Sequence, residues 1–153
     1  MDHVMIHPLA DVEPGAQIGA GTKVWRWTHV CATARIGKDC VIGQGCYVGP
    51  NVYIGDRVHI QNNVSVYEGV LIDNDAFIGP SVVFTNVKRP EPWNRKQQPV
   101  TTGIGKRVMI GANATIICGN NIWDDAVIGA GAVVTTSVLS GDTYMGNPAR
   151  RRE

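Results

Sequence analysis

The stretch IGKDCVIGQGCYVGPNVYIGDRVHI, residues 36–60, carries an aliphatic residue at every sixth position. The same step extends from Ile6 to Phe84, and each of these fourteen positions holds Ile or Val except the last. An α-helix has 3.6 residues per turn, so a strict period of six would scatter these anchors around its axis. Short strands joined by tight corners keep the anchors on one side, and β-branched residues suit strands. The period predicts an all-β coil.

A second column supports the coil. Small or β-branched residues follow most anchors by four positions, as at Thr22, Thr28, Ala34, Cys40 and Cys46. Glycine often follows the anchor directly, which suits a backbone that has positive φ or lies close to a neighbour. Three hexapeptides make one coil of a triangular prism with the anchors stacked inside. Twenty repeats predict between six and seven coils in a single domain, residues 1–153.

The repeat breaks at residues 85–103, TNVKRPEPWNRKQQPVTTG, and resumes at Ile104. Three prolines and many polar residues cannot continue a buried coil. A long excursion from a regular solenoid is usually functional or disordered. The sequence predicts one long excursion loop over about 85–103.

A coil of eighteen residues turns sequence spacing into spatial proximity. Residues eighteen apart lie one above the other, about 4.8 Å apart. Glu68 and Asn86 are so spaced, and the stack that contains His29 runs three residues before theirs. We expect an acid, an amide and a histidine to share one corner at the root of the loop. His59 belongs to the next ridge.

Composition excludes several functions. The formal net charge is +1, which gives no electrostatic case for nucleic acid or an anionic membrane. No apolar stretch approaches the roughly 20 residues that span a bilayer, and the N-terminus does not resemble a signal peptide. We expect a soluble, cytoplasmic protein. Cys40 and Cys46 occupy inward positions, Cys31 and Cys118 project elsewhere, and no CxxC spacing indicates a disulfide or a metal.

The pattern [LIV]-G-x-x-[STAV]-x resembles the hexapeptide-repeat acyltransferase superfamily over nearly the whole chain. Handedness does not follow from spacing, and parallel crossovers are normally right-handed. The resemblance implies instead a left-handed parallel β-helix. It also implies a homotrimer in which coenzyme A lies between two prisms and the loop reaches over a neighbouring subunit.

Within this superfamily the chain most resembles the nucleotide-amino-sugar N-acetyltransferases of surface-polysaccharide biosynthesis. The resemblance implies transfer of an acetyl group from acetyl-CoA to the amine of a UDP- or dTDP-linked 3-amino sugar. It is carried by the segments IHP (6–8), VWRWTHV (24–30), QNNVSVYEGV (61–70), GPSVVFTNV (79–87) and GNPAR (146–150).

The same resemblance implies the site residues. The catalytic candidates are Asn86, His29 and Glu68, although each has a plain structural reading: a coil cap, a packed histidine and a solvated turn residue. The pantetheine arm of CoA would follow the backbone amides of two small residues near the C-terminal coils. The full set of cofactor candidates is Ala112, Ala130, Asn147, Pro148 and Arg150.

The roles of several other polar and aromatic residues are left open by the sequence. Basic side chains pair well with phosphates, yet a solvated basic surface explains them equally. Trp93 and Arg95 would cover a nucleotide base or pack on a neighbour, and Asn120 would satisfy the coil. The remaining basic candidates for CoA phosphates are Lys106, Arg107, Arg151 and Arg152.

Three other functions are compatible with a prism of this kind and make different demands on the residues. Related O-acetyltransferases resemble one another in placing a base histidine near the loop, and residues 85–103 contain none, which disfavours a hydroxyl acceptor. His29 or His59 of a neighbouring subunit would be needed instead. A γ-type carbonic anhydrase needs three zinc-binding histidines; the chain has four, two of them at the extreme N-terminus, so no metal is expected. A non-catalytic scaffold keeps the fold without the chemistry.

Overall fold

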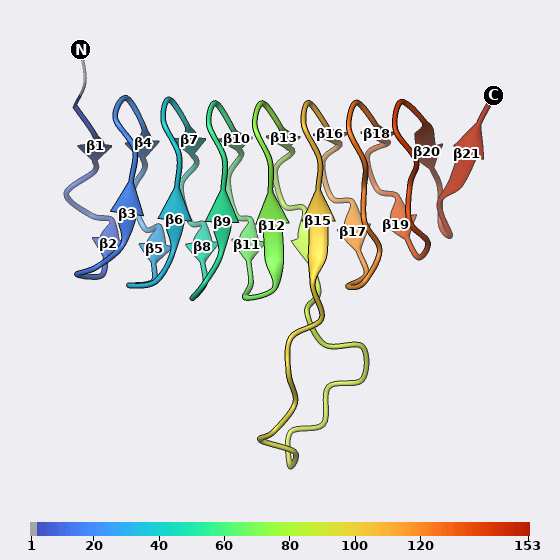
Figure 1. Ribbon diagram of the computed structural model, residues 1–153, viewed down its shortest axis with the longest axis horizontal. Helices are drawn as coiled ribbons and strands as arrows, with labels where there is room; N and C mark the ends of the chain where they lie inside the picture. The colour runs from blue at the N-terminus through green and yellow to red at the C-terminus, as the bar shows by residue number, and fades with distance from the viewer. Residues whose placement is uncertain (1–2) are drawn as a thin grey trace.

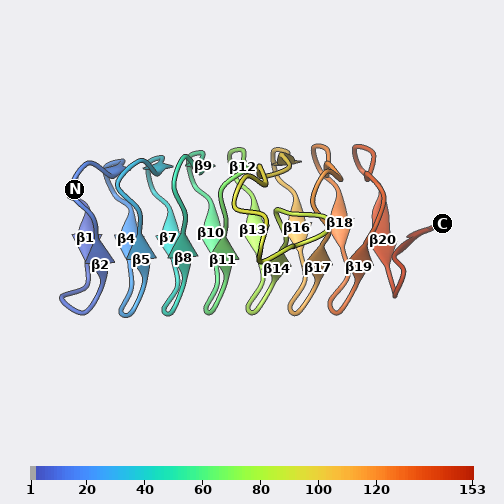
Figure 2. The same cartoon turned by 90° about the horizontal axis from the view of Figure 1, so that it is seen from below.

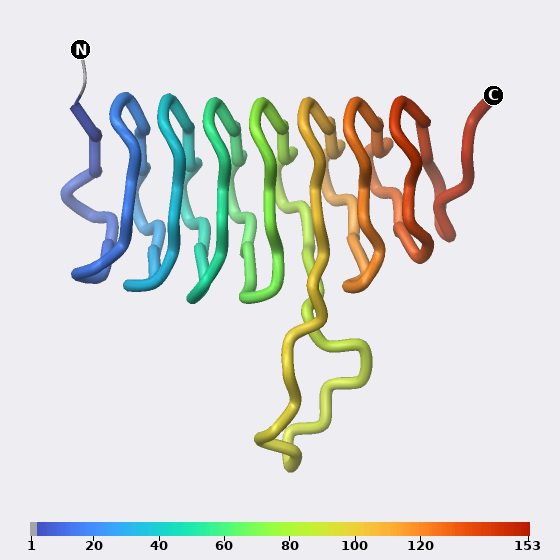
Figure 3. The backbone as a smooth tube through the Cα atoms, in the orientation of Figure 1, coloured from blue at the N-terminus to red at the C-terminus, as the bar shows by residue number. Residues whose placement is uncertain are grey.

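The computed structural model describes residues 3–153, which form a left-handed parallel β-helix (Figure 1). All the regular elements within that range are short strands, and no helix there is long and apolar enough to cross a membrane. The backbone winds as one continuous superhelix, with the two ends of the chain at opposite ends of the stack (Figure 3). This confirms the fold predicted from the six-residue period.

Three sheets form the sides of the prism, and their strand pairs are parallel except β20 with β21 (Figures 1 and 2). The first sheet contains β1 (Met5–Ile6), β4 (Lys23–Val24), β7 (Val41–Ile42), β10 (His59–Ile60), β13 (Phe77–Ile78), β16 (Met109–Ile110), β18 (Val127–Ile128), β20 (Thr143–Met145) and β21 (Arg150–Arg152). The second contains β2 (Asp11–Val12), β5 (His29–Val30), β8 (Tyr47–Val48), β11 (Ser65–Val66), β14 (Val83–Phe84), β17 (Thr115–Ile116) and β19 (Val133–Val134). The third contains β3 (Gln17–Ile18), β6 (Arg35–Ile36), β9 (Tyr53–Ile54), β12 (Val70–Ile72) and β15 (Thr102–Ile104).

Before the loop, each coil sets its strands on those of the previous coil with a register of eighteen residues. Across the loop the register is thirty-two residues, as between Phe77 and Met109. Met5 pairs with Lys23, and His29 pairs with Tyr47, both in parallel. The chain makes about eight turns, more than the six to seven predicted. The count was short because the final turn leaves the six-residue column: Val138 lies beside Ile122, only four residues after Val134.

The anchors fill the prism. Val24, Ile42, Ile60 and Ile78 are fully buried and form one core with the other anchors. Cores of this kind are stabilised by the removal of apolar surface from water, at roughly 25 cal/mol per Å². The first coil is covered on one side only, and Ile6 remains 45% exposed. The N-terminal end is therefore the open end of the core.

Polar atoms in the small inward positions are paired. The buried hydroxyl of Thr28 donates to the carbonyl of Gly43 at 2.7 Å and accepts from the amide of Cys46 at 3.2 Å. Cys40 and Cys46 lie in the core as predicted, and burial raises the pKa of both thiols. All four cysteines are free. Cys118, which was expected to project elsewhere, is in fact fully buried.

The glycines that follow the anchors serve close approach rather than a positive φ. At Gly79, a Cβ would lie 2.7 Å from the amide nitrogen of Ala112 and 2.8 Å from the carbonyl oxygen of Ile110. Positive φ occurs at other corner residues, such as Asn51 and Asn63. Asn tolerates that region better than most residues. Of the two reasons expected for glycine, the close approach of backbones holds.

The excursion loop is confirmed, with a corrected end. It runs from residue 85 to residue 101 and projects from the side of the prism (Figures 1 and 3). Thr102 and Gly103 were predicted to lie in the loop, but they already belong to β15, where they pair with Val70 and Leu71. Thr102 is fully buried, so it resumes the core two residues before the first new anchor, Ile104. Below, "the loop" means residues 85–101.

The close approach at Gly79 gives a stability prediction. Gly79→Ala should lower the free energy of unfolding by about 1–3 kcal/mol, because its methyl group would overlap backbone atoms that cannot rotate away. Urea denaturation measures the change. Gly103→Ala is the matched control, since its Cβ would meet nothing closer than 3.4 Å. We expect that variant to match the wild type or gain up to about 1 kcal/mol. Equal losses in both would contradict the explanation.

Candidate functional site at the loop root

A pocket of about 500 Å³ opens where the loop leaves the prism. Its floor is the end of β14 and the residue Ile117 after β17, and its walls come from the start of the loop. Tyr67, on the previous coil, closes one side. The pocket is lined by Tyr67, Val83, Phe84, Thr85, Asn86, Val87, Lys88, Pro90 and Ile117.

Asn86 is held in one orientation in this pocket. Its side-chain amide Nδ2 donates to the backbone carbonyl of Glu68 at 3.1 Å. Its own carbonyl accepts from the amide of Val100 at 2.7 Å, which ties the two ends of the loop together. Because Nδ2 must face a carbonyl, Oδ1 faces away from it and has no donor among residues 3–153. Asn86 therefore caps the coil, and within the described residues its Oδ1 remains an acceptor without a donor at the edge of a pocket that Asn86 lines.

Glu68 lies beside Asn86 in the stack, as the spacing predicted, but its carboxylate is directed elsewhere. Oε1 accepts from the side-chain amide of Asn51 at 2.8 Å, one coil nearer the N-terminus. Glu68 lines a separate pocket of about 280 Å³ on the other side of the loop root, together with Pro99 and Thr101. The backbone of Glu68 positions Asn86, while its carboxylate faces a second cavity.

His29 does not share this corner within one chain. The stack of His29, Tyr47, Ser65 and Val83 exists as predicted, in strands β5, β8, β11 and β14. It places His29 three strands from the level of Asn86, about 14 Å at the usual strand spacing. The expected meeting of acid, amide and histidine therefore fails for the histidine, since a shared column does not imply a shared level.

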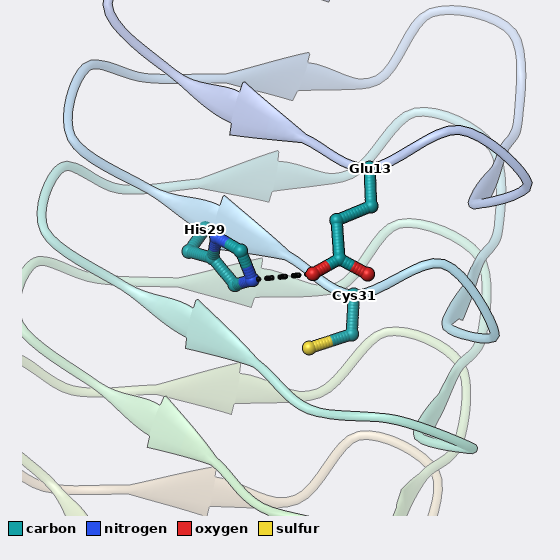
Figure 4. A group of neighbouring side chains, drawn as sticks. All are labelled: Glu13, His29 and Cys31. Carbon is teal, nitrogen blue, oxygen red and sulfur yellow. Dashed lines mark hydrogen bonds and ion pairs between the residues drawn. The ribbon is translucent and has the colours of Figure 1, made fainter.

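His29 instead belongs to a cluster near the N-terminal end that the sequence reasoning missed (Figure 4). Its Nδ1 lies 2.8 Å from Asp11 Oδ2 and its Nε2 lies 3.1 Å from Glu13 Oε1. The Cys31 thiol donates to the Tyr47 hydroxyl at 3.5 Å. The contact with Cys31 and burial raise the pKa of Tyr47 to about 12, because a phenolate would lie in a poorly solvated place beside a sulfur that can itself become negative. Tyr47 stays protonated at neutral pH.

The cofactor candidates Ala112 and Ala130 lie at a different corner, between the first and second sheets. At an earlier coil of this corner the amide of Gln44 donates to the side chain of Asn62 at 3.0 Å. The amides of Ala112 and Ala130 have no acceptor among residues 3–153, because no polar side chain follows them on the next coil. Both amides are available to a ligand that runs along the corner.

The GNPAR segment closes the C-terminal end. The amide of Ala149 donates to Val133 at 2.8 Å, Ala149 is buried, and the Asn147–Pro148 peptide bond is cis. Arg150 begins β21, the one antiparallel strand of the described chain, and its side chain is exposed. Asn147 and Pro148 are exposed as well.

The remaining candidates are dispersed. His59 is exposed on the first sheet between Val41 and Phe77, as predicted. Asn120 satisfies the coil, since its amide donates to the carbonyl of Ile117 at 2.8 Å. Trp93 is 81% exposed, and Arg95 is also exposed near the tip of the loop.

Among the basic residues considered for CoA phosphates, Arg107 and Arg151 are paired with carboxylates. Arg107 forms a two-point salt bridge with Asp125, which raises the pKa of the arginine and lowers that of the aspartate. Arg151 contacts Asp142 at 3.0 Å. Lys106 and Arg152 are exposed and have no salt bridge within residues 3–153.

Known proteins with similar sequences include acetyltransferases. A putative acetyltransferase, YvoF of Bacillus subtilis, is 51% identical over 47 residues, which cover 31% of this chain and 27% of that protein. The dTDP-3-amino-3,6-dideoxy-α-D-galactopyranose 3-N-acetyltransferase of Aneurinibacillus thermoaerophilus is 41% identical over 61 residues, 40% of this chain and 29% of that protein. The chain thus spans less than half of the length of these relatives.

Among solved structures, the acetyltransferase domain of PglB from Neisseria gonorrhoeae, in complex with acetyl coenzyme A, superposes with a TM-score of 0.62. The identity is 26%, and the match covers 97% of this chain and 57% of that chain. The family model for the bacterial transferase hexapeptide matches residues 33–67 and 51–86, and that for the hexapeptide repeat of succinyl-transferase matches residues 101–136. With its prism, its interrupted repeat and these matches, the chain belongs to the hexapeptide-repeat acyltransferase superfamily.

Proposed function

We propose that the protein transfers an acetyl group from acetyl-CoA to the amine of a nucleotide-linked 3-amino sugar. The observation that carries this proposal is the pocket at the loop root, where Asn86 holds a free side-chain oxygen. Similarity to a dTDP-amino-sugar N-acetyltransferase and to a domain solved with acetyl coenzyme A supports it. A cytoplasmic location and a role in surface-polysaccharide biosynthesis are parts of the proposal.

Asn86 would bind the attacking amine. Its Oδ1 accepts one N–H of a neutral amine, which turns the nitrogen lone pair away from Asn86 and toward the thioester carbonyl. Its Nδ2 is already engaged by Glu68, so the acceptor is held in place before the substrate binds. Positioning of two reactants in this way removes a large part of the entropic barrier. Lys88, at the rim, offers a positive charge to the diphosphate.

An amine acceptor fits the absence of a base from this pocket. No histidine is among its lining residues. A hydroxyl must lose its proton as it attacks and therefore needs a base, whereas an amine attacks in its neutral form and loses a proton afterwards. His29 would act only if a neighbouring subunit carried it to the pocket, and Glu68 only from its separate cavity.

The two halves of the proposed site require more than one chain. Ala112 and Ala130 come just before strands of the second sheet, whereas Asn86 comes just after one. The two alanines and Asn86 therefore lie at opposite ends of the strands of that sheet. Neither alanine lines the pocket of Asn86. We propose a homotrimer in which acetyl-CoA runs along the alanine corner of one subunit and meets the Asn86 pocket of the next. Asn147, Pro148 and Arg150 would contact the cofactor near the C-terminal end of the prism.

Thiol release tests the activity. With acetyl-CoA and a panel of UDP- and dTDP-linked sugars, we expect turnover on 3-amino sugars and at least tenfold less on sugars with a 3-hydroxyl. Faster turnover on hydroxyl acceptors would instead identify an O-acetyltransferase. If calorimetry detects no binding of acetyl-CoA or CoA, the scaffold alternative replaces the enzyme.

Substitution of Asn86 tests the site. Asn86→Ala should lower kcat/KM at least roughly tenfold, equivalent to about 1.4 kcal/mol, because the amine loses its acceptor. Asn94→Ala, in the exposed outer part of the loop, is the control and should keep wild-type kinetics. Urea denaturation separates this loss from a lost cap. A His29→Ala loss larger than that of Asn86→Ala would move the catalytic role to the histidine.

Light scattering during gel filtration tests the assembly. We expect three times the 16.5 kDa mass of one chain, since one subunit does not unite the two halves of the site. A monomer that turns over acetyl-CoA at full rate would contradict the shared site.

A further inference from the structure

The cluster around His29 lies outside the loop-root pocket and has no part in the proposed transfer. Asp11 and His29 pair across β2 and β5, and Glu13 and Cys31 follow each by two residues on the same face. The carboxylate, imidazole and thiol of Glu13, His29 and Cys31 lie within 4.8 Å of one another and converge on one point (Figure 4). These are three of the side-chain types that bind zinc.

Their spacing suits one ion. A tetrahedral Zn²⁺ holds nitrogen and oxygen ligands at about 2.0–2.2 Å and sulfur at about 2.3 Å, which leaves two ligand atoms roughly 3.3 Å apart. The distance from His29 Nε2 to Glu13 Oε1 is 3.1 Å. A modest outward movement of these two atoms would admit the ion, and Cys31 would supply the third ligand.

The surroundings already fix the ligands. Asp11 Oδ2 lies 2.8 Å from His29 Nδ1, which is the carboxylate–histidine contact that orients metal-bound imidazoles. The Tyr47 ring stacks on His29 with centroids 5.7 Å apart and planes at 7°, so the imidazole plane is set. Glu13 Oε2 accepts from the amide of Ala32 at 2.7 Å, which leaves Oε1 toward the cluster.

At this position a bound ion would stabilise the N-terminal end of the prism. The site joins the first coil to the second, at the end of the prism where the core is open and Ile6 is 45% exposed. Without a metal, His29 lies within hydrogen-bond distance of both carboxylates. A divalent cation would bind Nε2 and also engage Cys31, so it would fasten the two coils more strongly.

We propose that Glu13, His29 and Cys31 bind one Zn²⁺, with Asp11 orienting the histidine, and that the ion clamps the N-terminal coil. The proposal departs from the expectation of no metal, which rested on the lack of a CxxC spacing and on the position of the four histidines. The proposal is independent of acetyl transfer, because its readouts are metal binding and stability.

Titration of EDTA-treated full-length protein with Zn²⁺ and with Co²⁺ tests the site. Calorimetry should give one Zn²⁺ per chain. The Co²⁺ form should show a thiolate-to-metal charge-transfer band in the near ultraviolet, which reports Cys31 directly. Zn²⁺ should raise the Tm of the wild type, since it binds the folded state.

Variants define the ligands. Cys31→Ser should abolish the charge-transfer band and the Zn²⁺-dependent rise in Tm. Asp11→Asn should keep the band and weaken Zn²⁺ binding about 10–100-fold. His59→Ala, an exposed histidine on β10, is the matched control and should bind as the wild type does. Absence of stoichiometric binding, or a Co²⁺ spectrum without charge transfer, would overturn the proposal, and the wild type alone decides both points even if a variant misfolds.

Discussion

The structure depends on the eighteen-residue register between successive coils. Each strand donates and accepts along the prism axis, so outside the loop and the last coil a residue has its neighbour eighteen positions away. Backbones approach so closely that a methyl group at Gly79 would overlap the amide of Ala112. Anchors that point inward and residues that point outward are thereby fixed in columns. A functional site on this fold is a place where a column is interrupted or its polar groups are left unpaired.

The loop is the largest interruption, and the register explains how the prism tolerates it. Ile72 pairs with Ile104, thirty-two residues later, so the inserted segment leaves and returns within a single coil. The bond from Val100 to Asn86 closes its root. Asn86 lies at that junction, where the regular hydrogen bonds between successive coils stop and the loop begins. Its side chain consequently both closes the coil and faces a cavity, which joins the structural and the chemical interpretation of this residue.

The six-residue period predicted the fold, the loop and the inward cysteines, because each follows from a periodic backbone. The eighteen-residue spacing also implies three strand steps from His29 to Val83, so the expectation that His29 shares a corner with Asn86 was wrong because it took a shared column for a shared level. The sequence reasoning also missed the metal-binding candidates. Glu13 and Cys31 are eighteen apart, as are Asp11 and His29, so a search of all such pairs for ligand types would have found them. The direction of the Glu68 carboxylate toward Asn51 had no sequence signal, because a flexible side chain chooses among several neighbours.

The backbone amides of Ala112 and Ala130 have no hydrogen-bond acceptor within residues 3–153, and this suits them to bind a ligand. Along the corner that follows the third sheet, a side chain on the next coil accepts the backbone amide, as Asp56 does for Lys38 and Asp124 does for Lys106. On the corner of Ala112 and Ala130, Asn62 accepts from Gln44 in the same way, but the two alanines have no such acceptor on the next coil. A buried amide without a partner costs about 1–3 kcal/mol, and an exposed one is satisfied by water at little cost. Ala112 is half-buried and Ala130 is exposed, so their two amides cost little when water satisfies them. They are also in line to donate to an extended ligand with repeated carbonyls, which is the chemistry of a pantetheine arm.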